Sequence, residues 1–380
     1  MTRRSSSPQA SRPWRLPVVG LLALAVSGVM SLPAAAAAPP LGYQAIPLVP
    51  VTGQAFEASR TGNPITSTGR VAGTARPTPE SDVHAAAVFY LGNHTIRVLH
   101  PPGSSGSSAV DVNNLGQVAG SAEYPGRPRQ AFVWTSRTGT YRVLPLPPGA
   151  SSAYPYALND HGAVVGYYTD ADNHYRAFVS DPAVDDGRIR NLGTIGTDDY
   201  AVGTGINNAG DVIGYTFSLT RQGTRGFLWQ SRTGAMTSLG RPAGTNTMVP
   251  NDINDSGVIV GSAAYVPPVD REQDYRPGRG WVLSPVTGQF RELPAANSAD
   301  PAAEGTADAI NAHGIIVGGS YSAGTWSAVL WNACGTAKQV LAAHDDVTYA
   351  SGINRYERVL GVDALAPVLW RRNNGPCVLQ

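Results

Sequence analysis

"INNAGDVIGY" (residues 206–215) is one of several closely similar stretches in this chain, and their repetition decides the fold. The shared pattern is an apolar residue, Asn, two variable residues, Gly, a variable residue, an apolar residue, a variable residue and Gly. It recurs, with small departures, in "ITSTGRVAG", "VNNLGQVAG", "LNDHGAVVG", "INNAGDVIG", "INDSGVIVG", "INAHGIIVG" and "INRYERVLG", which end at Gly73, Gly120, Gly166, Gly214, Gly261, Gly318 and Gly361. Successive copies are 47, 46, 48, 47, 57 and 43 residues apart. A near-constant period of this length indicates a repeat architecture.

Each repeat carries two further apolar markers, which complete a unit of four short strands. In the fourth repeat, strands are predicted over "YAVGTGIN", "DVIGYTF", "RGFLWQ" and "AMTSLG". Such sheets cannot bury both faces alone, so they must pack on one another. We therefore predict an all-β, seven-bladed β-propeller of four-stranded antiparallel blades. A β-solenoid repeat array is the alternative, and the tight hairpin signals favour the propeller.

The sequence leaves open how the ring closes. "YQAIPL" at residues 43–48 and "CVLQ" at residues 377–380 both resemble a fourth strand, and only one is needed. The two cysteines, Cys334 and Cys377, fall near this seam. Because an even pair in an oxidising compartment suggests a bridge, we predict a disulfide between them.

The Asn and Gly of the repeated motif specify a hairpin turn. An Asn side chain bonds its own backbone two residues further on, and Gly supplies the positive φ where a short hairpin re-enters its strand. The motif is therefore predicted to be structural.

The N-terminus predicts export. Arg3, Arg4, Arg12 and Arg15 precede an uncharged run that ends in a small-residue cleavage zone near residues 36–38. We predict a Sec-type signal peptide over residues 1–38, followed by one propeller domain of seven repeats of about 47 residues over residues 39–380. The mature protein is then secreted or periplasmic, and no later segment is long enough to span a membrane as a helix.

Composition excludes some partners. Charged residues make up 14% of the chain, the net charge is +1, and the body has no basic block, so nucleic acid is not expected as a partner. Two cysteines without a nearby His pattern do not make a zinc site, and "TDADNH" lacks the later Gly and Glu of a calcium loop. We predict no metal, no cofactor and a monomer.

The motifs resemble those of the HAF-repeat family of bacterial extracellular proteins. In that family an Ile-Asn-x-x-Gly-x-Val-x-Gly element alternates with His-Ala-Phe-Leu-Trp and Leu-Gly-x-Leu-Gly-Gly elements. Here "INNAGDVIG", "AFVW" and "NLGTIG" correspond, over residues 43 to the end, although the eponymous His is replaced by Gln130, Arg176 and Arg225. The end repeats depart further, with Thr66 in place of the Asn and Glu357 in place of the Gly. The resemblance implies a secreted repeat protein and brings no catalytic residues.

Loop lengths predict the working face. The turns from strand one to two and from strand three to four are short and lie on one face, whereas the two-to-three and inter-repeat loops are long and lie on the other. Binding residues concentrate on such loops. Tyrosine beside Asp and Arg suits a sugar or a peptide, because Tyr combines rigid area with a polar tip. The candidate ligand-binding residues are Tyr167, Tyr168, Asp170, Asp172, His174, Tyr175, Arg176, Asp199, Tyr200, Tyr265, Asp274, Tyr275 and Arg276.

Three functions follow from these observations. The first is a non-catalytic binding or scaffold propeller with a carbohydrate or peptide ligand, and no enzyme. The second is a polysaccharide-active glycosidase or lyase that assembles carboxylates from several blades, for which Asp170, Asp198, Asp270 and Glu304 are the candidates. The third is a purely structural cell-surface protein. No G-x-S-x-G, H-E-x-x-H or phosphate loop occurs in the sequence, which favours the first function.

Overall fold

The fourth repeat shows how the sequence pattern becomes a sheet. β14 (Tyr200–Ile206), β15 (Val212–Ser218), β16 (Arg221–Gln230) and β17 (Ala235–Gly240) pair in this order, each antiparallel to the next. Alternate apolar residues point to one face, as the two-residue period of a strand requires. The four strands predicted for this repeat are therefore confirmed.

The computed structural model describes residues 43–51, 54–76, 84–267, 276–285, 287–300, 302–332, 338–341, 347–363 and 366–372, with the backbone alone at 276, 277 and 372. All of them belong to one unit, Ala37–Gln380. The predicted signal peptide, Cys334 and Cys377 lie outside the described residues. Cleavage and the disulfide stay predictions.

The other repeats form sheets of the same kind, which we number in chain order. Sheet 1 contains β2 (Ala55–Ala58), β3 (Arg70–Arg76), β4 (Ala85–Tyr90) and β5 (Thr95–Leu99); sheet 2 contains β6 (Gly106–Val112), β7 (Gln117–Tyr124), β8 (Arg127–Thr135) and β9 (Thr140–Val143); sheet 3 contains β10 (Ser152–Leu158), β11 (Val164–Thr169), β12 (Tyr175–Ser180) and β13 (Arg190–Asn191). Sheet 4 is β14–β17. Sheet 5 contains β18 (Thr247–Ile253), β19 (Ile259–Tyr265), β20 (Arg276–Leu283) and β21 (Phe290–Glu292); sheet 6 contains β22 (Glu304–Ile310), β23 (Ile316–Ser322), β24 (Thr325–Trp331) and β25 (Lys338–Val340); sheet 7 contains β26 (Thr348–Ile353), β27 (Val359–Asp363), β28 (Ala366–Arg372) and β1 (Tyr43–Pro47).

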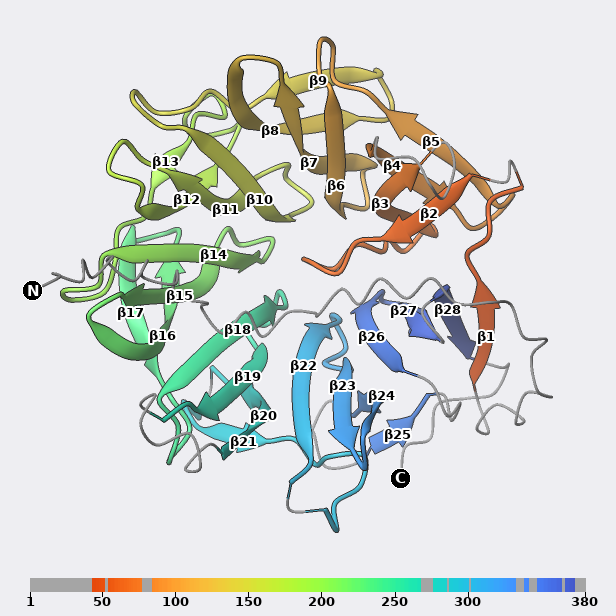
Figure 1. Cartoon of the computed structure of the whole chain (residues 1–380), viewed down its shortest axis with the longest axis vertical. Coiled ribbons are helices and arrows are strands. Elements are labelled where there is room, and N and C mark those ends of the chain that lie inside the picture. The colour runs from red at the N-terminus through yellow and green to blue at the C-terminus, as the bar shows by residue number, and fades with distance from the viewer. Residues whose placement is uncertain are drawn as a thin grey trace, which may run out of the picture. The chain divides into compact units, whose positions relative to one another are not determined.

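Sheets 2 and 3 are joined into one eight-stranded sheet by a single parallel pairing, between Ser152 and Arg129. Taken apart at this pairing, they match the other four-stranded units. The first strand of each unit lies nearest the common centre in Figure 1, and the fourth lies outermost.

Buried hydrophobic clusters lie between consecutive sheets. Phe132 and Trp134 of sheet 2 pack with Val88 of sheet 1, and Phe227 and Trp229 of sheet 4 pack with Val165 of sheet 3. Corresponding clusters join sheets 2 and 3, 4 and 5, 5 and 6, 6 and 7, and 7 and 1. The sheets therefore form a closed ring, as predicted for a β-propeller, rather than the open stack of a solenoid (Figure 1).

The N-terminal strand closes the ring. β1 pairs antiparallel with β28, from Tyr43 opposite Arg372 to Pro47 opposite Val368. Tyr43 and Leu48 are buried, and the N–H of Leu48 donates to the carbonyl of Pro367 at 2.9 Å. Of the two strands that the sequence left open, the structure thus uses residues 43–47 at the outer edge of sheet 7. "CVLQ" lies outside the described part of the chain.

The Asn of the repeated motif bonds both its own turn and the next sheet. In sheet 3, Oδ1 of Asn159 accepts the N–H groups of His161 (3.1 Å) and Ala163 (3.0 Å), which confirms the predicted turn. Its Nδ2 donates to the carbonyl of Asn207 in sheet 4 at 3.0 Å. The same link to the following sheet is made by Nδ2 of Asn113, Asn207, Asn254, Asn311 and Asn354, the last of them reaching Thr66 of sheet 1. These side chains tie the turns into a chain of hydrogen bonds around the ring.

The loop lengths differ in part from those predicted. The turns from strand one to two are short, and Gly162 and Gly210 in them have positive φ as expected. The two-to-three connection, predicted to be long, has only two residues in sheets 2, 4 and 6, namely 125–126, 219–220 and 323–324. Conversely, residues 181–189 make a long three-to-four loop in sheet 3.

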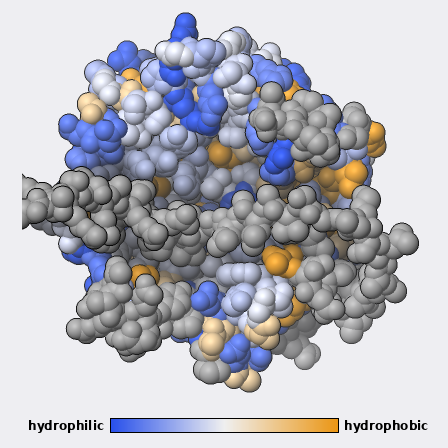
Figure 2. Space-filling view, in the orientation of Figure 1, coloured by the Kyte–Doolittle hydropathy of each residue, from blue (hydrophilic) through white to orange (hydrophobic). Residues whose placement is uncertain are grey.

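The surface in Figure 2 shows hydrophobic residues only as small separate patches in that view.

Candidate functional site

Seven aromatic side chains from sheets 3 and 4 form what we call the tyrosine cluster. It consists of Tyr154 and Tyr156 of β10, Tyr167 of β11, Tyr175 of β12, Tyr200 of β14, and Tyr215 and Phe217 of β15. β10 and β14 begin, and β11 and β15 end, at the edge of the ring opposite the Asn turns. The cluster therefore lies at the long-loop face that the sequence predicted as the working face.

The rings make continuous contacts from one sheet to the next. Tyr154 stacks on Tyr167 with centroids 5.0 Å apart, and Tyr167 contacts Tyr175 at 4.7 Å. Tyr175 meets the edge of Tyr200 at 5.7 Å, and Tyr200 stacks on Phe217 at 4.8 Å. Such contacts hold aromatic side chains in fixed orientations. The six tyrosines are half-buried, so they are both ordered and accessible.

Three of the cluster's tyrosines, Tyr156, Tyr167 and Tyr215, have a raised pKa and stay protonated. Burial raises the pKa of Tyr167 and Tyr215, and the neighbouring hydroxyl of Tyr156 raises both further. Burial also raises the pKa of Tyr156 itself. These three residues thus offer neutral hydroxyl groups, each able to donate and to accept a hydrogen bond.

A polar group borders the cluster. Arg176 donates from Nε to Oδ2 of Asp170 at 2.6 Å, from Nη1 to the carbonyl of Asp199 at 3.1 Å, and its Nη2 lies 3.0 Å from Nδ1 of His174. The His174 ring meets the edge of Tyr200 at 5.0 Å. Burial alone would raise the pKa of Asp170, but the bonds from Arg176 and from the N–H of His174 lower it below its usual value. Asp170 is therefore an ionised anchor for Arg176.

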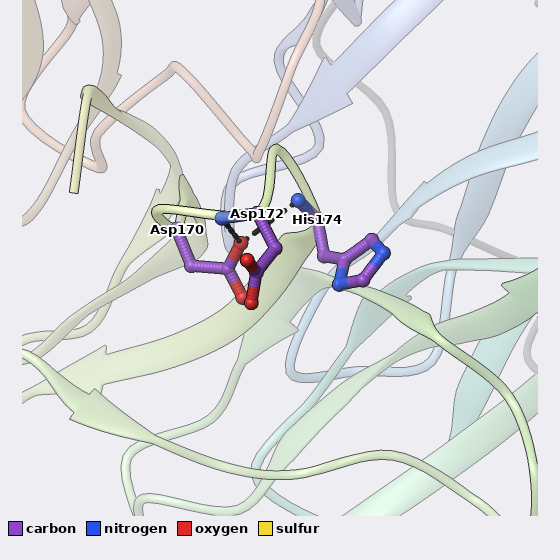
Figure 3. A group of neighbouring side chains, drawn as sticks. All are labelled: Asp170, Asp172 and His174. Carbon is purple, nitrogen blue, oxygen red and sulfur yellow. Dashed lines mark hydrogen bonds between the residues drawn. The ribbon is translucent and has the colours of Figure 1, made fainter. Parts of the chain in front are cut away.

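Figure 3 shows Asp170, Asp172 and His174 on the loop between β11 and β12, where their potential ligand atoms lie within 4.8 Å of one another. The N–H groups of Asp172 and His174 donate to Oδ1 of Asp170 at 3.0 and 2.9 Å. A cation here would compete with Arg176 for the Asp170 carboxylate. The side chain of Asp170 thus closes the turn between β11 and β12, and the sequence prediction of no metal stays a prediction.

The structure brings several of the predicted ligand residues together and separates others. Tyr167, Asp170, Asp172, His174, Tyr175, Arg176 and Tyr200 form or border the cluster, and the exposed Asp199 accepts from Ser218 through Oδ2 at 2.9 Å. Tyr168, predicted to bind ligand, does not join the tyrosine cluster. It is 6% exposed and packs in the hydrophobic cluster between sheets 2 and 3. Its neighbour Tyr167 points to the opposite side of the strand, as alternation requires.

The connection between β19 and β20, which carries the other predicted ligand residues, contributes little that the structure describes. Tyr265 is half-buried at the end of β19, and Arg276 is described only as the first backbone position of β20. Asp274 and Tyr275 lie outside the described residues. Their part in binding stays a prediction.

Four members of the cluster, Tyr154, Tyr156, Tyr215 and Phe217, were not among the predicted site residues. Sequence comparison of the repeats could have found Tyr215, because the position after the motif's last Gly is Thr74, Ser121, Ser262, Gly319 or Val362 elsewhere and Tyr only in repeats three and four. The signal is therefore a departure from the repeat consensus.

The predicted catalytic carboxylates are engaged in structural contacts where they are described. Oδ1 and Oδ2 of Asp198 pair with Arg221, and Oδ2 also accepts from Thr216 at 2.6 Å. Asp170 pairs with Arg176, and Glu304 is half-buried at the start of β22. Asp270 lies outside the described part of the chain.

Two other carboxylates clamp neighbouring sheets. Asp111 accepts the N–H of Leu158 in sheet 3 at 2.8 Å, and Asp252 accepts the N–H of Ile310 in sheet 6 at 2.9 Å. Burial raises the pKa of each to about 7, although these backbone bonds lower it in part. Both therefore titrate near neutral pH in the folded protein.

Stability should depend on pH through these two carboxyls. Their pKa is about 7 when folded and about 4 when unfolded, so the folded state binds more protons in this window. The free energy of unfolding should fall as the pH rises from about 4 to about 7, by more than about 1 kcal/mol for each carboxyl. Urea unfolding at several pH values measures this. The double variant Asp111→Asn, Asp252→Asn should make the profile shallower, with Asp308, whose pKa is raised to about 6, still contributing, and an unchanged slope would contradict the assignment.

A shallow depression lies on the short-turn face, away from the cluster. It is lined by Thr68, Gly69, Arg70, Tyr90, Leu91, Gly92 and Asn93. The two turns that border it, at residues 66–69 and 91–94, belong to sheet 1. We assign it no role.

Comparison with known proteins supports the fold. No family model matches the chain, and no curated protein does. Oligogalacturonate lyase from Vibrio parahaemolyticus is similar with a TM-score of 0.56 and 10% identity, over 88% of this chain and 98% of that one. The β-propeller domain of the Trilobed protease from Pyrococcus furiosus has a TM-score of 0.55 and 10% identity, over 85% and 96%. TolB from Acinetobacter baumannii has a TM-score of 0.47 and 11% identity, over 73% of this chain and 65% of TolB.

At these identities the likeness to the lyase and to the protease domain shows the fold alone, and the protein is a β-propeller. Within the described residues, no helix is long and apolar enough to cross a membrane.

Proposed function

We propose that this protein is an exported, non-catalytic propeller that binds carbohydrate at the tyrosine cluster. The observation that carries the proposal is the cluster itself, a continuous aromatic surface across two sheets on the long-loop face. Tyrosine rings stack on the apolar faces of sugars, and their hydroxyls bond sugar hydroxyls. Arg176, Asp170 and His174 supply charged and polar partners at its border.

The state of the carboxylates favours binding over catalysis. A glycosidase needs one carboxyl that donates a proton and a second placed nearby as base or nucleophile. Three carboxyls have a raised pKa: Asp111 and Asp252 each accept two backbone N–H groups, and Asp308 accepts from Thr306 and is hydrogen-bonded to Tyr349 and Gly319. Asp170 and Asp198 are each paired with an arginine. These engagements suit structural roles, and export is expected from the N-terminal sequence.

A panel of soluble polysaccharides tests the proposal. The full chain would be run by affinity electrophoresis in gels that contain xylan, mixed-linkage β-glucan, galactomannan, polygalacturonate or glycol chitin, beside a glycan array. Retardation by at least one of them is expected. Failure of every polysaccharide and every arrayed glycan to bind would contradict the carbohydrate assignment, and binding of peptides instead would support the other ligand class.

Replacing Tyr200 by Ala should weaken binding at least about tenfold, because the variant loses a stacking face and leaves His174, Tyr175 and Phe217 without their shared neighbour. Calorimetry with the retarding polysaccharide measures the effect. Tyr356→Ala is the matched control, since Tyr356 is 57% exposed in the Asn turn of the last repeat, on the opposite face. Equal loss in both variants would contradict a site at the cluster.

A further inference from the structure

Trp326 is an exception among the described tryptophans. Trp134, Trp229, Trp281, Trp331 and Trp370 are buried between sheets, whereas Trp326 is only half-buried. It also stands five residues before Trp331, which occupies the place of the repeat's own marker. A tryptophan that the core does not bury and that packs with other aromatic side chains near the surface is a candidate ligand contact.

Trp326 belongs to a second aromatic group, in sheets 6 and 7. Its ring lies 5.7 Å from Tyr321 and 6.0 Å from Tyr349, the latter edge to face. The small Gly319 makes this packing possible, since a Cβ there would lie 2.8 Å from Cε3 of Trp326 and 2.7 Å from Cδ2 of Tyr349. The group is therefore closely packed around Trp326.

The carboxylate of Asp308 holds the second aromatic group in place through hydrogen bonds. Asp308, on the inner strand β22, accepts from Oγ1 of Thr306 at 2.7 Å and is hydrogen-bonded to the hydroxyl of Tyr349 and to the backbone of Gly319. Burial raises the pKa of Asp308 to about 6, so above that pH it is an ionised acceptor. Because Tyr349 contacts Trp326, the carboxylate also restrains the tryptophan. A ring restrained in this way loses little entropy when a ligand binds.

The second group shares the face of the tyrosine cluster. β23 ends at Ser322 and β24 begins at Thr325, so Tyr321 and Trp326 flank a two-residue connection on the long-loop face. Tyr349 is the second residue of the inner strand β26, at the same end of the ring. In Figure 1, sheets 6 and 7 (blue) lie across the ring from sheets 3 and 4 (yellow-green to green).

We propose that Tyr321, Trp326, Tyr349 and Asp308 form a second carbohydrate subsite, so that one polysaccharide chain crosses the face and occupies both sites. The inference rests on the proposed function and adds its substrate class: polymers rather than short sugars. Trp326 provides the stacking platform, and Asp308 with the Tyr349 hydroxyl provides the acceptor for sugar hydroxyls. Two sites on one rigid scaffold bind a long chain more tightly than either site alone, through effective concentration.

Calorimetry with an oligomer series tests this, using oligosaccharides of two to eight sugars from the polysaccharide that retards the protein, and the polymer itself. The wild type should bind two equivalents of short oligomer, and Trp326→Ala one. For the polymer, Trp326→Ala should bind at least about tenfold more weakly. Trp326→Phe, which keeps a ring, should recover part of the affinity, and circular dichroism checks that each variant is folded.

The variants separate the two proposals. If Tyr200→Ala weakens binding and Trp326→Ala matches the wild type at every length, the second subsite is overturned while the proposed function stands. If Tyr200→Ala binds like the wild type, the proposed function fails at its stated site. A single equivalent of short oligomer on the wild type would also overturn the second subsite.

Discussion

Replacing Gly214 by Ala should destabilise the protein by more than about 3 kcal/mol. Gly214 is the last residue of the repeated motif. A Cβ there would overlap the carbonyl oxygen of Val202 on the inner strand and lie 2.6 Å from Cζ of Phe227. Because backbone and a fully buried ring are both fixed, neither can yield cheaply. Urea denaturation followed by circular dichroism measures the loss, as a lower midpoint or an unfolded variant.

The same substitution at Gly92 is the matched control. A Cβ at Gly92 has no atom within 4 Å, and its φ is not positive, so Gly92→Ala should change stability by no more than about 0.5 kcal/mol. The same backbone overlap occurs at the last Gly of every repeat, at Gly73, Gly120, Gly166, Gly261, Gly318 and Gly361. If Gly214→Ala is as stable as Gly92→Ala, the close approach of the inner strand does not explain the recurrence of this glycine.

The local structure could be predicted because it depends on nearby residues. Strand alternation, the Asn turn and the Gly with positive φ all act within one repeat, and repeat four folded as expected from β14 to β17. The propeller followed because identical units with two apolar faces must pack on each other. The closure by β1 could not be decided, since residues 43–48 and 377–380 have equally suitable patterns.

The site was harder to predict because a repeat consensus hides what differs between repeats. The tyrosines were assigned to loops, whereas Tyr167, Tyr175 and Tyr200 lie in strand ends. Alternation separates Tyr167 from the buried Tyr168, and only the strand register decides which one faces the cluster. The repeat pattern accounts for Trp331 as its apolar marker and does not predict Trp326, five residues earlier. In this chain, the places where repeats disagree point to candidate sites better than the motif that they share.

The links around the ring also escaped prediction, since each joins residues about one repeat apart. Replacing Asn159 by Ala tests them and should cost about 2–4 kcal/mol. The N–H of the buried Ala163 loses its acceptor, and the carbonyl of Asn207 loses the Nδ2 donor from the preceding sheet. Asn159 is 5% exposed, so water does not readily replace either partner. The urea midpoint again reports the change.

A second variant at this position, with a control elsewhere, separates the contribution of the turn from that of the hydrogen bond to the next sheet. Asn159→Asp keeps an acceptor for the turn and removes the donor to Asn207, so its loss measures the link between sheets, together with the repulsion of a carboxylate from that carbonyl. Asn297→Ala is the control, because Asn297 is exposed and its Oδ1 accepts the N–H of Ala299, at 3.1 Å. It should cost less than about 1 kcal/mol. If Asn159→Ala costs no more than this control, the buried asparagines close their turns but do not hold neighbouring sheets together.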